Sequence, residues 1–437
     1  MFDFKIQEKH NLKVLGVIVR VKRMKLGYSL RDLAQLTNIS HTLISNFEKG
    51  QLTPHSDTIK DIFRVLNLSF NDDPEISIKF KKLYDKAFKH IVFYEYDEAG
   101  LIIKEIENDK KIYENSSEVI NYAIIQCLYY SISDIYFEQI DTLFSQYEVA
   151  LGFFTEKQKQ LFYFIKGLDY INKELFADAR YLFEKALSLG DSKLDLLINE
   201  YYVISLSKAN KYVDARIIAQ DCISKFESET NYVRAMRLRT RIAYDYSRLN
   251  MYPQAEKLYN EVLDYSIKYN IKDLVNRCNT RLSLLSIIKG DIIKAEEYLK
   301  KVTPNCSKLY HYIMFDIVSS KKDEKKFLEL YNESMSFDWV LKSQKAKLFF
   351  ELIKMRYDEK YMDKKRYENN LKKLSKLGLK ADDGEMIEVV CNMQIDFLTK
   401  ERKYKQAFEA AQTLLHYNKN GIKDSKFDPK ANYWIYK

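Results

Sequence analysis

A four-residue phrase, aromatic-x-x-Ala, returns along the chain at a nearly regular distance and restricts the possible folds more than any other feature. It occurs as YDEA, FADA, YVDA, YPQA and YKQA, ending at Ala99, Ala179, Ala215, Ala255 and Ala407. A degenerate FEQI ends at Ile140 and an IIKA at Ala295. With these two included, the phrase recurs from Ala99 to Ala295 with a period of about 40 residues, which predicts a stack of similar supersecondary units.

Helices are the expected content of these units, because residues that break helices are scarce. The 437 residues include only 5 Pro and 11 Gly, which argues against turn-rich β architectures. Apolar residues make up 46% of the chain, enough to bury a large core in more than one domain. No apolar run is long enough for a signal peptide or a membrane span. The sequence therefore predicts an all-α, soluble, cytoplasmic protein without a membrane partner.

The alanine of each phrase marks the point where two helices should touch, with an aromatic residue three positions earlier. This pattern resembles the tetratricopeptide repeat, here with slightly lengthened loops. The resemblance implies that helix pairs stack into a right-handed solenoid with an extended concave surface. Roughly eight or nine pairs would fit the chain. Between residues 305 and 383 the helical rhythm continues without the small alanine, so the sequence does not fix the repeat boundaries there.

The N-terminal 70 residues follow a different pattern, that of several short helices joined by tight turns. Gly27 ends a first amphipathic helix, and Ser29 and Ser40 are natural N-caps for a second and a third. Asn38 forms the turn between these two, and Gly50 is the expected left-handed stop. A fourth helix begins after Pro54. The residues expected to face inward are Leu30, Leu33, Ala34 and Leu36 of the second helix, and Leu43, Ile44 and Phe47 of the third.

The stretch SLRDLAQLTNISHTLISNFEKGQLTP, residues 29–54, resembles the helix-turn-helix of the lambda-repressor and Cro-like family. The match includes the small Ala34, which lets the two helices cross closely. The resemblance implies that the third helix lies in the major groove of DNA with its N-terminal residues at base edges. The side chains at base-contacting positions are His41, Thr42, Ser45 and Asn46, and Ser40 is expected at a phosphate. A merely solvated helix face is the alternative for any one of them.

Positive charge gathers in the same region. The chain through Phe70 has 11 Lys or Arg against 6 Asp or Glu, a balance of +5 out of +9 for the whole protein. Cations beside a recognition helix neutralise phosphates and give DNA binding a salt-dependent part. The candidate phosphate contacts are Lys13, Arg20, Lys22, Arg23, Lys25, Arg31 and Lys49.

The repeat register also selects candidates for a ligand groove. Asn199, Arg239 and Asn279 each lie sixteen residues before a repeat alanine, so they occupy equivalent positions. Such side chains can hydrogen-bond the backbone of an extended peptide, and Arg239 could pair with a carboxylate. Ordinary polar contacts between repeats are the alternative interpretation.

A Cro-like helix-turn-helix joined directly to tetratricopeptide-like repeats resembles the RNPP family of peptide-responsive quorum-sensing regulators of Gram-positive bacteria. In length and layout the chain is nearest to the longer members, of the type that controls sporulation and toxin production in clostridia. The resemblance implies a homodimer that binds promoter DNA, a short signalling peptide in the repeat groove, and no enzymatic activity. The expected domains are a helix-turn-helix over 1–70, a helical connector over 71–95 and the repeat domain over 96–437.

Two other functions remain open from the sequence. The array could be an adaptor that binds and inhibits a phosphorelay or other regulatory protein, as the related Rap proteins do. It could also hold an enzyme, although no nucleophile and base stand in a recognisable constellation. The five Cys and six His are scattered without zinc-site spacing, so no metal or cofactor is expected and the thiols are predicted to be reduced core residues.

Overall fold

The computed structural model describes residues 9–71, 73–133, 147–148, 151–190, 192–304 and 307–420. Over these ranges the chain is built from helices and contains no strand, which confirms the predicted all-α class. The chain divides into two compact units, Met1–Lys173 with Tyr181–Ile198, and Glu174–Arg180 with Asn199–Lys437. No helix of the described part is long and apolar enough to cross a membrane.

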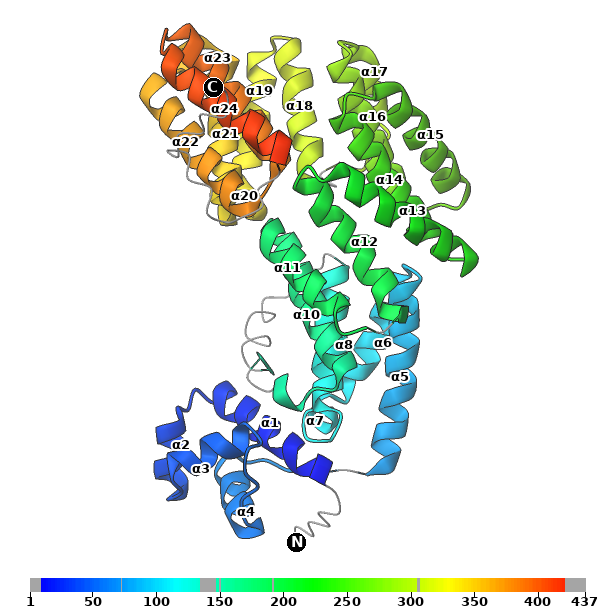
Figure 1. Ribbon diagram of the computed structural model, residues 1–437, viewed down its shortest axis with the longest axis vertical. Coiled ribbons are helices and arrows are strands. Elements are labelled where there is room, and N and C mark those ends of the chain that lie inside the picture. Colours follow the sequence, from blue (N-terminus) through cyan, green and yellow to red (C-terminus); the bar gives the residue numbers. More distant parts are fainter. Residues whose placement is uncertain are drawn as a thin grey trace. The chain divides into compact units, whose positions relative to one another are not determined.

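Four helices form the N-terminal helix-turn-helix, coloured blue in Figure 1. They are α1 (Lys9–Lys25), α2 (Leu30–Thr37), α3 (His41–Glu48) and α4 (Ser56–Val65). The turns after the first three contain Gly27, Asn38 and Gly50, whose φ angles are 75°, 53° and 60°. Glycine and asparagine tolerate this left-handed conformation best, so the residues expected to end the helices do so.

Side-chain caps fix where α2 and α3 begin. The Ser29 hydroxyl accepts a hydrogen bond from the Asp32 amide, and the Asp32 carboxylate accepts one from the Ser29 amide, which completes a capping box. The Ser40 hydroxyl accepts a hydrogen bond from the Leu43 amide and caps α3. Each cap satisfies amides that have no partner inside the helix, and each is worth about 1 kcal/mol.

The core of this domain follows the predicted apolar faces with one exception. Leu33 of α2 and Ile44 and Phe47 of α3 are buried. Leu36, expected to face inward, is 54% exposed, so that prediction is wrong. It lies about one turn beyond Leu33, next to the last residue of a helix of only eight residues.

The helices that follow in the same unit carry the first repeat alanine. They are α5 (Pro74–Val92), α6 (Tyr96–Asn108), α7 (Lys110–Tyr113), α8 (Val119–Ile132), the short 3-10 helix η1 (Leu151–Phe153) and α10 (Glu156–Asn172). Helix α5, which spans most of the expected connector, packs along α6 and so forms a helix pair with it. The division between the two units falls within α11 (Phe176–Leu187) and α12 (Ser192–Lys208).

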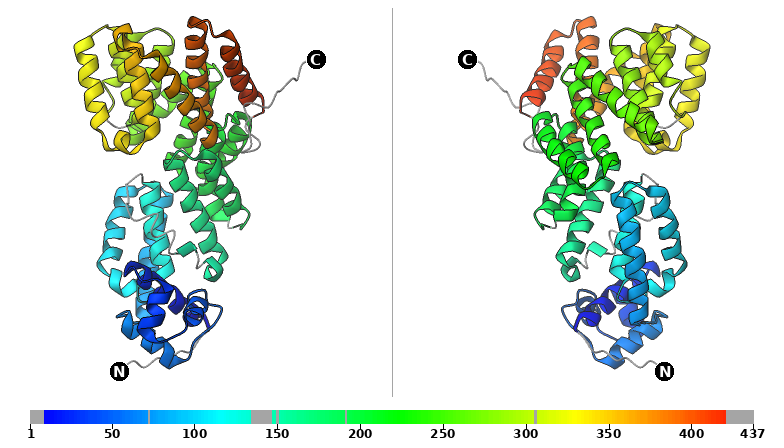
Figure 2. Two further views of the ribbon diagram at one scale, coloured as in Figure 1. Left: turned by 90° about the vertical axis from the view of Figure 1, so that its left-hand side faces the viewer. Right: turned by 90° about the vertical axis from the view of Figure 1, so that its right-hand side faces the viewer.

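The second unit repeats one helix pair at a regular distance along the chain. The first helices of successive pairs include α14 (Tyr232–Arg248) and α16 (Lys272–Ile288), and the second helices are α13 (Tyr212–Ser228), α15 (Tyr252–Lys268) and α17 (Ile292–Leu299). The four helices α13 to α16 each have 17 residues and are joined by three-residue turns. A tetratricopeptide repeat of ordinary length with the same turns would have helices of about 14 residues. The added length therefore lies in the helices, which corrects the expectation of lengthened loops (Figures 1 and 2).

The repeated phrase has one structural role throughout the described repeats. Its aromatic or aliphatic first residue is the first residue of a helix, and its alanine is buried in the fourth position. Five residues before the alanine, the backbone takes a positive φ, which turns the chain from one helix of the pair into the next. These turning residues are Tyr94, Glu174, Asn210, Asn250, Gly290 and Arg402. The degenerate phrase at Ile140 lies outside the described residues.

The stretch where the alanine is lost uses a different core. It contains α18 (Lys308–Ser320), α19 (Glu324–Ser336), α20 (Asp338–Lys342), α21 (Gln344–Tyr357), the 3-10 helix η2 (Glu359–Tyr361) and α22 (Lys364–Ala381). The Phe315 ring packs on Phe327 and Phe350, with ring centroids 5.3 and 5.4 Å apart. In this stretch large aromatic rings pack between the helices, whereas in the other repeats a small alanine stands at the helix contact. The alanine phrase returns in the last pair, α23 (Gly384–Lys400) and α24 (Tyr404–Asn420).

The cysteines behave as the sequence predicts where they can be placed. Cys127, Cys222, Cys278 and Cys391 are free and buried, and burial raises the pKa of each thiol to about 12. They are therefore protonated core residues at neutral pH. Cys306 lies outside the described residues.

Two glycines of the helix-turn-helix offer a matched test of packing. Both have positive φ, but a Cβ at Gly27 would have open space, whereas a Cβ at Gly50 would overlap the ring of Phe153 in η1. We expect Gly27→Ala to cost about 1–2 kcal/mol of backbone strain, and Gly50→Ala to cost about 1–3 kcal/mol more through overpacking. Thermal unfolding would measure both.

The double variant Gly50→Ala, Phe153→Ala serves as the control for this contact. It should cost less than the sum of its single substitutions, because the ring that clashes with the new methyl group is gone. Additive effects would show that Phe153 does not pack on this turn.

Candidate functional site

Helix α3 presents the surface expected to read DNA. His41 and Thr42, in its first turn, are exposed, and Ser45 and Asn46, one turn later, are half-buried. The opposite side of the helix carries Ile44 and Phe47 into the core. The four predicted base-contacting side chains thus lie on the side of α3 away from Ile44 and Phe47. Ser40 is exposed at the start of α3, although its hydroxyl also serves as the helix cap.

Some of the predicted phosphate contacts are open to solvent, and others belong to the interior of the domain. Arg31 and Lys49 are exposed and Lys22 is half-buried, so all three can reach solvent beside α3. Lys25 is exposed too, but its ammonium lies 2.6 Å from the Glu114 carboxylate at the end of α7. The side chain of Lys13 lies outside the described residues.

Arg23 belongs to the interior of the domain, which corrects its interpretation as a free cation. Its guanidinium donates to both carboxylate oxygens of Glu48, at 2.6 and 2.8 Å, and to the carbonyl of Tyr28 at 2.6 Å. Glu48 is 1% exposed, and Arg20 lies 3.8 Å from the same carboxylate. These contacts hold α1 against the end of α3 and leave Arg23 little capacity for phosphate.

Sequence reasoning missed Glu48 as a structural residue, although a signal was present. The position follows Phe47 at the end of α3, where the FEKG segment matches the family pattern. A carboxylate so placed must be paired when buried, and the arginines of α1 are the nearby cations. Burial lowers the pKa of Arg20 more than the adjacent Glu48 raises it.

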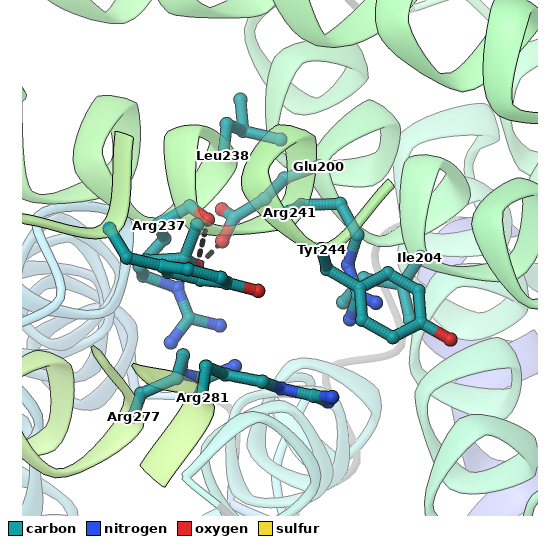
Figure 3. A pocket seen from close by; sticks show the side chains of 10 residues that line it. Glu200, Ile204, Arg237, Leu238, Arg241, Tyr244, Arg277 and Arg281 are labelled. Carbon is teal, nitrogen blue, oxygen red and sulfur yellow. Dashed lines mark hydrogen bonds and ion pairs between the residues drawn. The ribbon is translucent and has the colours of Figure 1, made fainter. Parts of the chain in front are cut away.

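The second candidate site is a pocket formed by three successive repeat helices. It is lined by residues of α12, α14 and α16 and by Tyr259 of α15, and its cavity volume is about 50 Å³. Figure 3 shows Arg277 and Arg281 facing Glu200 and Arg237 across it. The lining residues are Glu200, Ile204, Arg237, Leu238, Thr240, Arg241, Tyr244, Tyr259, Arg277 and Arg281.

Part of the positive charge in this pocket is neutralised within the chain. Glu200 accepts hydrogen bonds from Arg237 at 2.8 Å and from the fully buried Arg234. Burial alone would raise the pKa of Glu200, but the two arginines outweigh it and lower that pKa. Asp273 lies 3.6 Å from Arg237 and 3.4 Å from Arg277. Glu200 is therefore ionised and fixes the orientation of α12 against α14.

The three predicted peptide-contacting residues do not come together in this pocket. Arg239 pairs with Glu227 at 2.7 Å, and Asn279 is buried with its amide donating to the Val275 carbonyl of its own helix. Asn199 is half-buried, whereas its neighbour Glu200 lines the pocket. The repeat register identified equivalent positions correctly, but the lining arginines lie two residues away on each side of 239 and 279.

The described part of the chain contains no set of side chains that could bind a metal ion. No group of three or more His, Cys, Asp or Glu stands close enough there to hold an ion.

Comparison with known proteins first defines the class. Residues 19–72 match the Helix-turn-helix family, so the chain contains a helix-turn-helix domain followed by a helical repeat solenoid. No curated protein sequence is similar enough to count as a match.

Solved structures then identify the particular repeat fold. A Rap protein complexed with competence and sporulation factor is similar, with a TM-score of 0.65 and 15% identity, over 78% of this chain and 98% of that one. NprR in complex with its cognate peptide NprX gives a TM-score of 0.60 and 14% identity over 77% and 98%. The apo form of the quorum sensor NprR from B. thuringiensis gives 0.55 and 13% over 78% and 99%. The chain thus has the fold of Rap and NprR proteins.

The buried pair of the helix-turn-helix leads to a stability prediction. We expect Glu48→Ala to destabilise this domain by about 3–5 kcal/mol, because it leaves buried arginine charge unpaired. Lys25→Ala, which breaks the exposed pair with Glu114, should cost less than about 1 kcal/mol. Hydrogen exchange of the α1 and α3 amides would report both. Equal protection in the two variants would contradict a structural role for the Arg23–Glu48 pair.

Proposed function

We propose that this protein is a DNA-binding transcription regulator whose repeat array senses a short signalling peptide and thereby controls promoter binding. The observation that carries the proposal is the combination in one chain of a helix-turn-helix, with α3 side chains open to solvent, and a solenoid of the Rap and NprR type. The functional parts are a DNA head and a ligand pocket, and the protein acts without catalysis.

DNA reading is assigned to α3 and the cations around it. In this proposal His41, Thr42, Ser45 and Asn46 reach base edges in the major groove, and an asparagine can hydrogen-bond an adenine through two atoms. Lys22 and Lys49, with Arg31, would hold phosphates on either side. One such head has a small interface, so we propose a homodimer that spans two half-sites about one helical turn apart.

Peptide sensing is assigned to the repeat solenoid. Two structurally similar proteins, the Rap protein and NprR, were solved with competence and sporulation factor and with the peptide NprX. By analogy, a peptide in the groove would favour one arrangement of the repeats and alter the affinity of the heads for DNA, a coupling between two sites. We further propose that its target genes belong to the class that the sequence resemblance implies, those that control sporulation and toxin production in clostridia.

Base reading can be separated from folding by substitution on α3. Thr42→Ala with Asn46→Ala should abolish preference for the selected sequence while leaving thermal stability within about 1 kcal/mol, because neither side chain is buried. Selection from randomised duplexes with the full-length protein supplies the operator, and electrophoretic mobility shift measures the loss. Lys60→Ala on α4, a cation paired with Asp57, is the matched control. A wild-type protein that selects no sequence would refute the proposed DNA reading.

Phosphate contacts should respond to salt instead. Lys22→Ala and Lys49→Ala should each weaken binding to all duplexes and reduce the slope of log K against log salt by about 0.9. Arg23 is excluded from this test because its substitution would break the buried pair with Glu48. An unchanged slope in both variants would remove these lysines from the interface.

The adaptor function is the second candidate, and the similarity to a Rap structure over 98% of that chain favours it. In that case the array would bind and inhibit a phosphorelay or other regulatory protein. Full-length Thr42→Ala, Asn46→Ala protein separates the two functions. If this variant still captures a candidate phosphorelay protein and produces the wild-type phenotype, the protein acts as an adaptor. Loss of the phenotype would support DNA regulation.

A further inference from the structure

The arginines that line the repeat pocket are more numerous than the carboxylates that line it. Four arginines and one carboxylate line the pocket, and the nearby Asp273 is half exposed. Arg237 forms an ion pair with Glu200, and Arg277 forms one with Asp273. Buried or half-buried cations are stable only when anions or hydrogen-bond acceptors face them. The remaining two, Arg241 and Arg281, decide what the pocket can bind.

Arg241 and Arg281 occupy equivalent positions in successive repeats, on α14 and α16. Within the described residues, neither guanidinium makes an ion pair or hydrogen bond to a carboxylate. Instead, their central carbons lie 4.9 and 4.8 Å from the centre of the Tyr244 ring. Stacking on an aromatic ring stabilises a guanidinium and fixes its plane but uses none of its five N–H donors. Both side chains are therefore oriented, with donors available.

The carboxylate nearest to Arg241 along its helix does not fully neutralise it. Asp245 is 3% exposed, and burial raises its pKa to about 7 despite the adjacent Arg241. One of its oxygens accepts from Ser207 at 3.1 Å, and the other is buried without a partner. At neutral pH Asp245 is thus only partly ionised, and burial lowers the pKa of Arg241 more than Asp245 raises it. Positive charge remains on this wall of the pocket.

A tyrosine supplies a second, independent sign of a ligand. Tyr259 of α15 lines the pocket and is 1% exposed, and its hydroxyl is buried without a hydrogen-bond partner. An unpaired buried hydroxyl costs free energy, so it needs an acceptor that this chain does not provide there. A ligand oxygen in the pocket would accept from Tyr259 and from the arginine forks together.

The chain itself places a carboxylate at the edge of this cluster. Glu385 of α23 accepts hydrogen bonds from Lys208 at 2.7 Å and from the Tyr244 hydroxyl at 3.0 Å. Burial would raise the pKa of Glu385, but Lys208, Arg281 and Arg248 lower it well below its usual range. The environment around Tyr244 therefore stabilises carboxylate charge.

We propose that this pocket binds the carboxylates of an acidic ligand through Arg241, Arg281 and Tyr259, and that the ligand is an acidic segment of the signalling peptide. The inference rests on the proposed peptide sensing and specifies its chemistry. Arginine forks match carboxylates in two-point hydrogen bonds, which gives both affinity and orientation. A small free dicarboxylate shares this chemistry and is distinguished from a peptide by the test below.

The test measures thermal stabilisation of the full-length protein by matched probes at constant ionic strength. One pool contains heptapeptides with a single glutamate at each internal position in turn, and the second pool has glutamine in its place. Succinate is the small-dicarboxylate probe, with succinamide as its neutral counterpart. The acidic pool should raise the melting temperature more than the neutral pool does, because only acidic peptides stabilise the folded state through the arginines.

Substitutions assign the effect to the pocket. Arg241→Gln with Arg281→Gln should weaken binding of the acidic pool by about 10- to 100-fold, the loss expected for hydrogen bonds to charged groups. Arg239→Gln is the control, because it removes an arginine of α14 whose partner is Glu227 outside the pocket. Tyr259→Phe should lower the ligand-induced shift without destabilising the ligand-free protein, and it keeps the test valid if the double arginine variant fails to fold.

The possible outcomes separate this proposal from peptide sensing itself. Equal stabilisation by the two peptide pools would overturn the carboxylate proposal and leave peptide sensing in place. A shift with succinate alone would support the carboxylate chemistry and argue against a peptide. A shift that survives both the arginine double variant and Tyr259→Phe, or no shift with any probe, would overturn the proposal.

Discussion

The repeat array depends on the close approach of two helices at each repeat alanine. In the repeats from Ala99 to Ala295 this alanine is completely buried wherever it is described, so no larger side chain fits without moving the neighbouring helix. A residue with positive φ five positions earlier sets the turn that brings the helices together. Because the contact recurs at a constant spacing in the central repeats, it also sets which residues of α12, α14 and α16 face the same side. The arginine-lined pocket is a consequence of that register.

Buried ion pairs then add orientation to this packing. Arg234 and Arg237 of α14 both bind Glu200 of α12, and in the other unit Arg23 of α1 binds Glu48 of α3. Such pairs contribute little net stability compared with apolar packing of the same shape, but removal of one partner is costly. Their physical role is to make one arrangement of two helices far better than its alternatives. Both candidate sites of the protein are built on helices held in this manner.

The helix-turn-helix shows how far local sequence signals reach. Ser29, Ser40 and Gly50 each act within a few residues of the backbone that they cap or turn, so their roles could be predicted from the sequence. Such short-range signals do not assign Arg23, because its partner Glu48 is 25 residues distant and the choice of Arg23 among the arginines of α1 depends on how α1 crosses α3. The prediction for Leu36 was wrong for a related reason, because a local apolar pattern does not show which residues of α2 the rest of the domain covers.

The repeat pocket shows the same division. Equal distances from the repeat alanines identified 199, 239 and 279 as equivalent positions, but a period does not say which way a position points. A step of two residues rotates a side chain by about 200° around a helix, so Arg237 and Arg241 lie on the side opposite to Arg239. Positions 237, 241, 277 and 281 also recur with the repeat period. The sequence does not show that this face of the helices, and not the face with Arg239, lines the groove.

The sequence by itself determined the all-helical class, the helix-turn-helix with its caps and turns, and the repeat period, because each depends on contacts between residues near one another along the chain. Only the tertiary structure decided that the extra repeat length lies in the helices, that Arg23 is an interior residue, and that four arginines of α14 and α16 converge with Tyr244 and Tyr259 on one pocket. These features arise from the direction of side chains and from pairings between distant segments. Helix packing sets both, and no local pattern encodes them.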